Sequence, residues 1–279
     1  WLRQAGGGGL SRTFLRPKGQ LALAWSPSPA LDVNARLQRR VGQLNFFDFL
    51  ATVNLNDDRT NAGNPDLVPP QSWEMEVETS RKLGAWGNTS LRLYAHRVDD
   101  IVDIVPIGDA GQSPGNIDRA TRHGAEWKAS INLDPLGLGG VRLDARWWLQ
   151  DSRVRDPLTG ERRRIGNSLI RFAQLTLRHD VPGTDWAWGG GASHELYARD
   201  VRLTEEGRRW EGPVWANVYI EHKNVAGLTL RATAGNQLGA MSRWDRTVYT
   251  GRRDGPIDYL EHRDRRIGPI FSFAVSGKF

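Results

Sequence analysis

The sequence predicts an all-β protein, namely a transmembrane antiparallel up-and-down β-barrel. Three observations lead to this prediction. Apolar and polar side chains alternate within segments, short and long connections alternate between the segments, and the segments are long enough to cross a membrane. Residues 141–150 show the alternation well, because every second residue from Val141 to Leu149 is apolar or aromatic and most of those between are charged or polar. A strand places two such sets on opposite faces, whereas a helix would mix them.

The same alternation defines about eleven strands. In residues 73–79, for example, Trp73, Met75 and Val77 alternate with three glutamates. Three consecutive glycines interrupt the pattern at 189–191, and glycine weakens a strand interior. In chain order, the predicted strands cover residues 13–26, 31–42, 71–83, 88–105, 116–132, 140–152, 168–180, 186–199, 211–223, 227–240 and 264–279.

The connections between these strands alternate in length. Turns rich in Pro, Gly, Asn and Asp, which favour hairpins, lie at residues 26–30, 84–87, 134–140, 181–185 and 224–227. Longer polar stretches lie at residues 43–70, 106–116, 153–167, 200–210 and 241–263. Outer-membrane barrels combine short periplasmic turns with long external loops in this way. A strand of about ten residues, tilted by about 45°, spans ~24 Å, which matches their apolar band of ~25 Å.

Composition is consistent with a barrel and excludes other classes. The 279 residues contain no apolar run near the ~20 that a membrane helix needs. The mean hydropathy of −0.53 does not argue against a barrel, because the polar residues that face its lumen lower the average. There is no cysteine, and therefore no disulfide framework and no thiolate site. The 12 Trp and 31 Gly residues suit interfacial belts and tight turns.

The strand count is odd. If the short turns are periplasmic, the last strand ends in the periplasm and the first begins outside the cell. Bacterial barrels of this kind have an even number of strands and both ends on one side. We therefore expect further sequence upstream and predict that residues 1–279 are the C-terminal portion of one larger barrel domain.

The last strand resembles the assembly signal of outer-membrane barrels, which ends on an aromatic residue. Its residues are Phe271, Phe273, Val275 and Phe279, and Gly277 stands where a large apolar residue is common. An ordinary edge strand is the alternative, but an exposed Phe-rich edge favours aggregation of a soluble protein.

A segment in the first long loop carries a family resemblance. Residues 63–72 read GNPDLVPPQS, and the two prolines at 69 and 70 set a stiff, extended entry into a strand. The segment resembles the "GNPxLxPExS" segment of TonB-dependent outer-membrane receptors, with Pro70 in place of the usual Glu. The matching residues are Asn64, Pro65, Leu67, Pro69 and Ser72. Residues 116–127 and 247–279 are similar to other parts of that family.

The resemblance implies a barrel of about 22 strands, a plug domain upstream, and a location in the outer membrane of a Gram-negative bacterium. It also implies uptake of a scarce large solute, by family habit a ferric siderophore or other metal chelate, driven by the inner-membrane TonB energising complex. Outer-membrane lipid is the other expected partner. The alternatives are a passive porin-like or other plug-less barrel, a non-transport surface barrel and a soluble β protein.

Two groups of residues are candidates for function. Charges on the polar strand faces either form cross-strand ladders that hold the barrel wall or contact the plug or an anionic solute; they are Glu74, Glu76, Glu78, Arg92, Glu126, Arg142, Asp144, Arg146 and Arg231. In the first long loop, Phe46, Phe47 and Phe49 either contact a ligand or pack the loop onto the barrel rim.

The sequence proposes no enzyme, cofactor or metal site. Its six histidines are scattered and form no HExxH motif. Asp99, Asp100 and Asp103 can ligand a cation or simply form a solvated acidic strand end. The net charge of +6 permits nucleic-acid binding, but the arginines alternate with apolar residues inside strands, so no nucleic acid is predicted as a partner.

Overall fold

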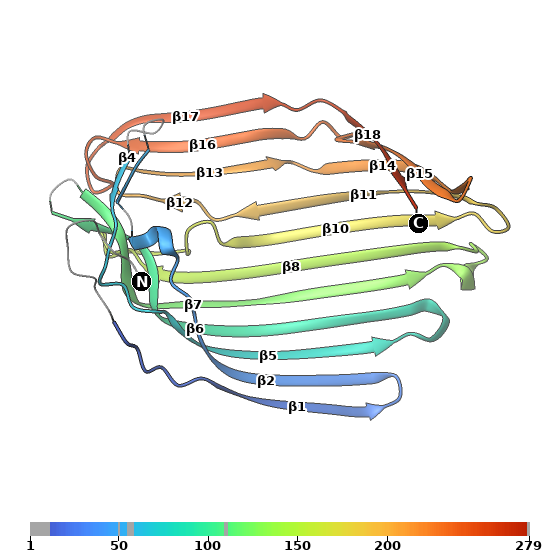
Figure 1. The fold of residues 1–279 in the computed structure, drawn as a ribbon, viewed down its shortest axis with the longest axis horizontal. Helices are drawn as coiled ribbons and strands as arrows, with labels where there is room; N and C mark the ends of the chain where they lie inside the picture. Colours follow the sequence, from blue (N-terminus) through green and yellow to red (C-terminus); the bar gives the residue numbers. More distant parts are fainter. Residues whose placement is uncertain (1–11, 50, 55–58, 109–110, 278–279) are drawn as a thin grey trace.

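The computed structural model describes residues 12–49, 51–54, 59–108 and 111–277. Eleven strands follow one another in a single antiparallel sheet, each paired with its neighbour along this path (Figure 1). This confirms the predicted fold class and strand number. The strands are β1 (Gly19–Ser28), β2 (Leu31–Val41), β5 (Gln71–Lys82), β6 (Gly87–Ile107), β7 (Gly111–Asn132), β8 (Val141–Arg155), β10 (Leu169–Asp180), β11 (Trp186–Tyr197), β14 (Trp215–Val225), β15 (Leu228–Gly235) and β18 (Ile270–Ser276).

A second sheet continues four of these strands beyond the loop end. It consists of β12 (Asp200–Val201), β13 (Glu205–Gly212), β16 (Met241–Tyr249) and β17 (Ile257–Arg266). The prediction of loops at 200–210 and 241–263 was therefore wrong for much of both ranges. These strands carry charges on both faces, so they lack the alternation by which the other strands were recognised.

The remaining elements are short. They are the 3-10 turns η1 (Phe46–Phe49), η2 (Gly84–Trp86) and η3 (Asp134–Leu136), and the strands β3 (Ala51–Asn54), β4 (Arg59–Ala62) and β9 (Arg162–Arg163). The predicted loop at 106–116 is mostly strand, because β6 and β7 pair as far as Ile107 and Gly111. Among the described residues, no helix is long and apolar enough to cross a membrane.

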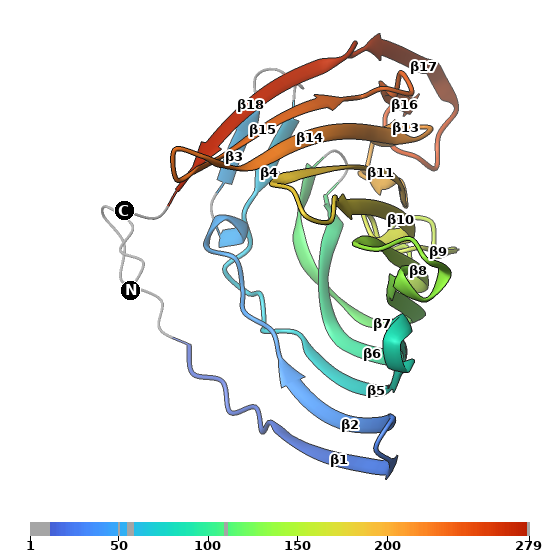
Figure 2. The same cartoon turned by 90° about the vertical axis from the view of Figure 1, so that its right-hand side faces the viewer.

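All short turns lie at one end of the sheet and the longer connections at the other (Figure 1). β1 and β18 both run from the loop end towards the turn end. Seen along the strands, the sheet curves into an arc with β1 and β18 at its two ends (Figure 2). Within the described part of the chain these two strands do not pair with each other.

The two faces of the arc differ in chemistry. Side chains on the concave face converge and are shielded, as Glu126 at 3% exposure shows. Side chains on the convex face diverge, and large apolar residues there remain exposed, for example Leu23 at 65% and Trp147 at 52%. An apolar exposed face and a polar shielded face are the arrangement of a barrel whose outside contacts lipid.

The glycine run did not break its strand. β11 continues through Gly189–Gly191 and pairs with β10 on one side and β14 on the other. A Cβ at Gly189 would lie 2.8 Å from the hydroxyl oxygen of Tyr219 on β14. The glycine therefore makes room for a tyrosine ring on the concave face, which is a packing reason for its place in the strand.

Candidate functional site

A ladder of alternating charge crosses five neighbouring strands on the concave face. Arg36 of β2 donates to Glu76 of β5 at 2.6 Å. Arg92 of β6 lies 3.7 Å from Glu76 and donates to Glu126 of β7 at 2.8 Å. Arg146 of β8 donates to the other oxygen of Glu126 at 2.7 Å. Each carboxylate lies between two guanidinium groups, and this compensates the cost of shielding the charges from water.

The other predicted charges lie on the same face. Arg142 pairs with Asp144 along β8 at 3.0 Å. Arg231 lies over the ring of Tyr219, 3.6 Å from the ring centroid, and 3.8 Å from Glu221. Glu78 stands in register with Arg92 on the next strand. The geometry thus brings most of these charges into pairs along the wall rather than into one cluster.

Three ligating groups do come together on this wall. Oxygens of Glu74 and Glu76 and a ring nitrogen of His96 lie within 4.8 Å of one another. Glu76 already accepts from Arg36, however, and Glu74 accepts from Ser72 at 2.7 Å. A cation at this place would compete with these donors, so the arrangement favours the charge ladder over a metal centre.

A buried tyrosine also connects three strands, and the sequence analysis did not identify it. Trp148 of β8 donates to the hydroxyl of Tyr94 on β6 at 2.7 Å, and that hydroxyl donates to Gln150 at 2.8 Å. The ring covers Gly124 of β7, where a Cβ would lie 2.5 Å from the tyrosine oxygen. The signal for this contact is a glycine in mid-strand with an aromatic residue directly across from it.

The GNPDLVPPQS segment fixes the first long loop to the barrel wall. Asn64 donates to the carbonyl of Pro114 at 2.9 Å, and Leu67 is 1% exposed. Asn116 of β7 accepts from the backbone of Val68 and donates back to its carbonyl, each at 2.9 Å. Two of the segments that carry the family resemblance, 63–72 and 116–127, therefore meet in space. Pro65 is exposed, Pro69 is half-buried, and Ser72 is the second residue of β5 and donates to Glu74.

The aromatic turn lies directly beside this segment. The backbone N–H of Asn64 donates to the carbonyl of Asp48 in η1 at 2.9 Å. Phe47 is 67% exposed, and Phe49 is half-buried. The backbone of Phe46 belongs to η1, and its side chain lies outside the part of the chain that the structure describes. Of the two side chains that the structure describes in this turn, Phe47 is the more exposed.

The predicted terminal signal lies on the convex face of the sheet's last strand. Phe271, Phe273 and Val275 are 76%, 66% and 54% exposed, and the two phenylalanines stand opposite alanines of β15. Phe279 lies outside the described residues. These exposed side chains continue the apolar outer surface of the neighbouring strands.

A buried ion network holds the loop end together. Asp156, 2% exposed, accepts from Arg163 at 2.6 Å and from Arg253 at 2.7 Å, and Arg163 also donates to Asp103 at 2.8 Å. Burial alone would raise the pKa of Asp156, but the backbone N–H of Thr159 and the two guanidinium groups outweigh it and lower this pKa to about 2. The network joins residues up to 97 positions apart, and the sequence offered no signal for it.

The second sheet is rich in arginine and tryptophan. On one of its faces, Arg209 lies 4.2 Å and Arg263 lies 5.3 Å from the ring of Trp244. On the other, Arg208 lies 4.5 Å from the ring of Trp210. The loop end of the chain thus presents cations and aromatic rings together, a combination suited to anionic and aromatic groups.

A comparison with protein-family models decides the affiliation of the chain. The model of the TonB-dependent receptor-like β-barrel matches residues 4–252. The chain belongs to this family. The members of the family are outer-membrane receptors and transporters of Gram-negative bacteria, so the convex apolar face is the lipid-facing wall and the concave face lines the lumen.

Solved structures with the same fold come from several bacteria. A variant of the ferric enterobactin receptor PfeA from Pseudomonas aeruginosa matches with a TM-score of 0.61 at 12% identity, over 92% of this chain and 39% of its own. The siderophore receptor PirA from Acinetobacter baumannii matches with a TM-score of 0.59 at 12% identity, over 92% of this chain and 40% of its own. The FrpB iron transporter from Neisseria meningitidis matches with a TM-score of 0.56 at 11% identity, over 92% of this chain and 37% of its own. The chain therefore spans about two fifths of the length of these structures. A search of curated proteins finds no match.

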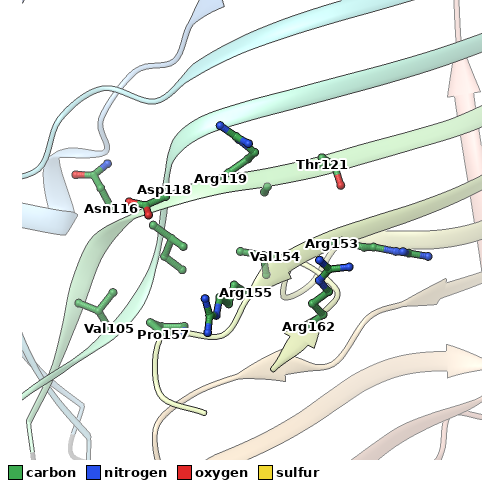
Figure 3. Close-up of a pocket in the computed structure, with 12 residues that line it drawn as sticks. Val105, Asn116, Asp118, Arg119, Thr121, Arg153, Val154, Arg155, Pro157 and Arg162 are labelled. Carbon is green, nitrogen blue, oxygen red and sulfur yellow. The ribbon is translucent and has the colours of Figure 1, made fainter. Parts of the chain in front are cut away.

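A cleft of about 740 Å³ opens in the barrel wall where the pairing of β7 with β8 ends. The last pair between the two strands is Ala120 with Val154. Figure 3 shows Arg155, Pro157 and Arg162 on one side of the opening and Val105, Asn116 and Asp118 on the other. The sequence analysis did not identify this cleft, because its two sides come from segments about 40 residues apart in the chain.

Proposed function

We propose that the chain is the C-terminal portion of a receptor barrel that imports a large solute through the outer membrane with energy from the inner-membrane TonB complex. A ferric siderophore or similar metal chelate is the solute we propose. The observation that carries this proposal is the loop end of the chain, where a second sheet presents the arginines around Trp244 and Trp210. Anionic, aromatic chelates are complementary to such a surface.

The directions of the end strands support the assignment to part of a larger barrel. Because β1 and β18 run the same way, an antiparallel barrel closes only if an odd number of further strands lies between them. Eleven more strands meet this condition and give the 22 of large outer-membrane transporters. A second copy of this chain in the same orientation also supplies eleven strands but does not close the barrel, since β1 would pair in parallel with β18 of that copy.

Uptake by the full-length receptor tests the proposal. The gene is deleted, and iron-limited growth and cell-associated iron are measured with catecholate and hydroxamate ferric siderophores supplied one at a time. We expect loss of uptake of at least one chelate, and the same loss when the TonB complex is inactivated. Uptake of small solutes without TonB would indicate a passive barrel, and no transport phenotype with any solute would indicate a surface barrel; either result contradicts the proposal.

Phe47 is the proposed ligand-contact residue of the first loop. Replacing Phe47 with Ala in the full-length receptor should weaken binding of the transported chelate roughly 10-fold, since an aromatic contact contributes about 1 kcal/mol beyond area burial. Leu136→Ala is the control, because Leu136 is similarly exposed, at 62%, but lies at the turn end. Equal effects of the two changes would remove Phe47 from the binding site.

A further inference from the structure

Seven exposed arginines gather on the outer wall, just beyond the apolar surface. They come from β6, β7, β8 and the hairpin and strand that follow: Arg97, Arg119, Arg153, Arg155, Arg162, Arg164 and Arg171. Arg153 and Arg155 lie an even number of residues after Trp147 and Leu149 on β8, so they share the lipid-facing side of the strand. Arg153 stands opposite Thr121, which stands opposite Arg97. We call this group the outer arginine patch.

The patch is not neutralised by the acids within it. Asp99 lies 3.1 Å from Arg97 and 3.3 Å from Arg119, so that one carboxylate serves two guanidinium groups. Asp151 is shared in the same way by Arg164 at 2.9 Å and Arg153 at 3.5 Å.

The arginines beyond these two acids have still less compensation. Arg155 donates to the carbonyl of Gly160 at 3.1 Å, and Arg162 makes no ion pair within the described residues. The side chains of Arg97, Arg119, Arg153 and Arg164 are 50–63% exposed. The patch therefore presents excess positive charge outward.

The height of the patch places it at the level of lipid headgroups. Leu149, 45% exposed, is the last apolar residue on the outer face of β8. Arg153 follows four residues later, about 13 Å along the strand and about 10 Å along the membrane normal at the usual tilt. The polar headgroup layer begins at the edge of the hydrocarbon and is about 5–7 Å thick, and a long arginine side chain can reach back into it. The loop end is the external end, so this layer belongs to the outer leaflet.

The cleft between β7 and β8 lies within the patch. Its polar rim includes Arg119, Arg153, Arg155 and Arg162 against a single carboxylate, that of Asp118, and its volume of about 740 Å³ is large enough for a sugar-phosphate headgroup. Ile117 and other apolar side chains complete its lining. The opening thus combines several cationic groups with an apolar floor.

We propose that the outer arginine patch binds the phosphate groups of a phosphorylated glycolipid in the outer leaflet. A guanidinium group is the side chain best suited to bidentate contact with phosphate. The lumen charges are compensated within the wall. The patch, in contrast, has uncompensated positive charge that faces the lipid, where a phosphate supplies the missing negative charge. The inference uses the membrane placement of the family and is independent of the transported solute.

Lipid binding by the purified full-length receptor in non-ionic detergent tests the proposal. The probe is diphosphoryl lipid A, titrated against the wild type and against the triple variant Arg119→Gln, Arg153→Gln, Arg162→Gln. At roughly fivefold per exposed basic residue near a lipid surface, we expect the three changes together to weaken binding roughly 100-fold. The matched control is the double variant Arg81→Gln, Lys82→Gln, which removes two exposed cations from the turn end of β5, away from the outer leaflet, and should change binding less than about 3-fold.

Each further arm separates the proposal from an alternative. Lipid A without phosphate should bind much more weakly than the diphosphoryl form; equal binding would mean that acyl chains alone are recognised. Inorganic phosphate should not displace the lipid at equal concentration; if it does, the site takes free phosphate. Wild-type affinity in the patch variant, or an equal loss in the control, would overturn the proposal.

The lipid-binding result can be separated from effects on folding and from effects on transport. Heat-modifiable gel migration checks that each variant forms a barrel. If the patch variant fails to fold, the wild type still provides a test, because its affinity for the diphosphoryl probe should fall as salt rises from about 0.1 to 0.5 M, and a salt-independent affinity would contradict a phosphate site. Lipid affinity is read without any uptake assay, so failure of the transport proposal leaves this measurement intact.

Discussion

The two faces of β7 and β8 carry the same kinds of charged residue and use them differently. On the lumen face, Glu126 is 3% exposed and lies between Arg92 and Arg146. On the outer face, Arg119 and Arg153 are 57% and 63% exposed and each shares its aspartate with another arginine. Successive residues of a strand point to opposite faces of the sheet. The face to which a charged residue points therefore decides whether its charge holds the wall together or remains available to a partner.

The largest expected effect comes from breaking the ladder on the lumen side. Glu126→Gln removes the charge that compensates two arginines, and loss of one member of a shielded ion pair costs about 3–5 kcal/mol. The apparent temperature of heat-modifiable unfolding of the full-length receptor should fall clearly. Asp144→Asn is the control, because Asp144 is 39% exposed and should change stability by less than about 1 kcal/mol. Equal effects of the two changes would contradict the ladder.

A second prediction concerns the contact between the loop and the wall. Asn116→Ala removes hydrogen bonds to the N–H and carbonyl of Val68 and to the carbonyl of Asp100. Each unpaired shielded group costs about 1–3 kcal/mol, so residues 63–72 should lose their protection from amide hydrogen exchange while the strands keep theirs. Unchanged protection of Val68 would show that Asn116 does not hold the segment.

The interaction of Asp156 with Arg163 and Arg253 should respond to pH. The folded-state pKa of Asp156, about 2, lies below its ordinary 3.8, so the pairing stabilises the loop end above about pH 4 and this contribution is lost as the pH falls through 2. The contribution is about 2 kcal/mol. The protection of residues 156–163 from amide hydrogen exchange, corrected for the pH dependence of the intrinsic exchange rate, should therefore fall between pH 4 and pH 2.

Asp156→Asn is the control for that titration. The variant should have low protection at pH 6 and show no change with pH over the same range, because it has no carboxylate to titrate. A wild type whose protection is constant down to pH 2, or a variant that titrates like the wild type, would contradict the role of Asp156.

The parts that the sequence predicted and the parts that it did not differ in their surroundings. Strands such as 141–150 were recognisable because one face meets lipid and the other meets water, which imposes a period of two. β13, β16 and β17 have charged residues on both faces, so residues such as Arg208 and Arg209 follow one another without alternation.

The contacts between distant segments were predictable only where a motif pointed to them. Asn64 and Asn116 each belonged to a segment with a family resemblance, and the structure joins both segments. Asp103 lies in β6, Asp156 and Arg163 lie in the connection between β8 and β10, and Arg253 lies between β16 and β17. These segments share no sequence pattern, and the fold brings the four side chains together. Tyr94 and Gly124 were visible as residues, but their pairing needed the register of β6 and β7.

The most direct test of the account is spin-label accessibility along β8. The chain contains no cysteine, so single cysteines at residues 142, 143, 144, 145 and 147 can be labelled one at a time in the full-length receptor in lipid bilayers, after any cysteines elsewhere in that receptor are replaced. We predict that labels at 143, 145 and 147 collide mainly with oxygen dissolved in the bilayer, and that labels at 142 and 144 are shielded from it. A smooth profile without a period of two, or the opposite phase, would contradict the assignment of the lumen and lipid faces on which the account rests.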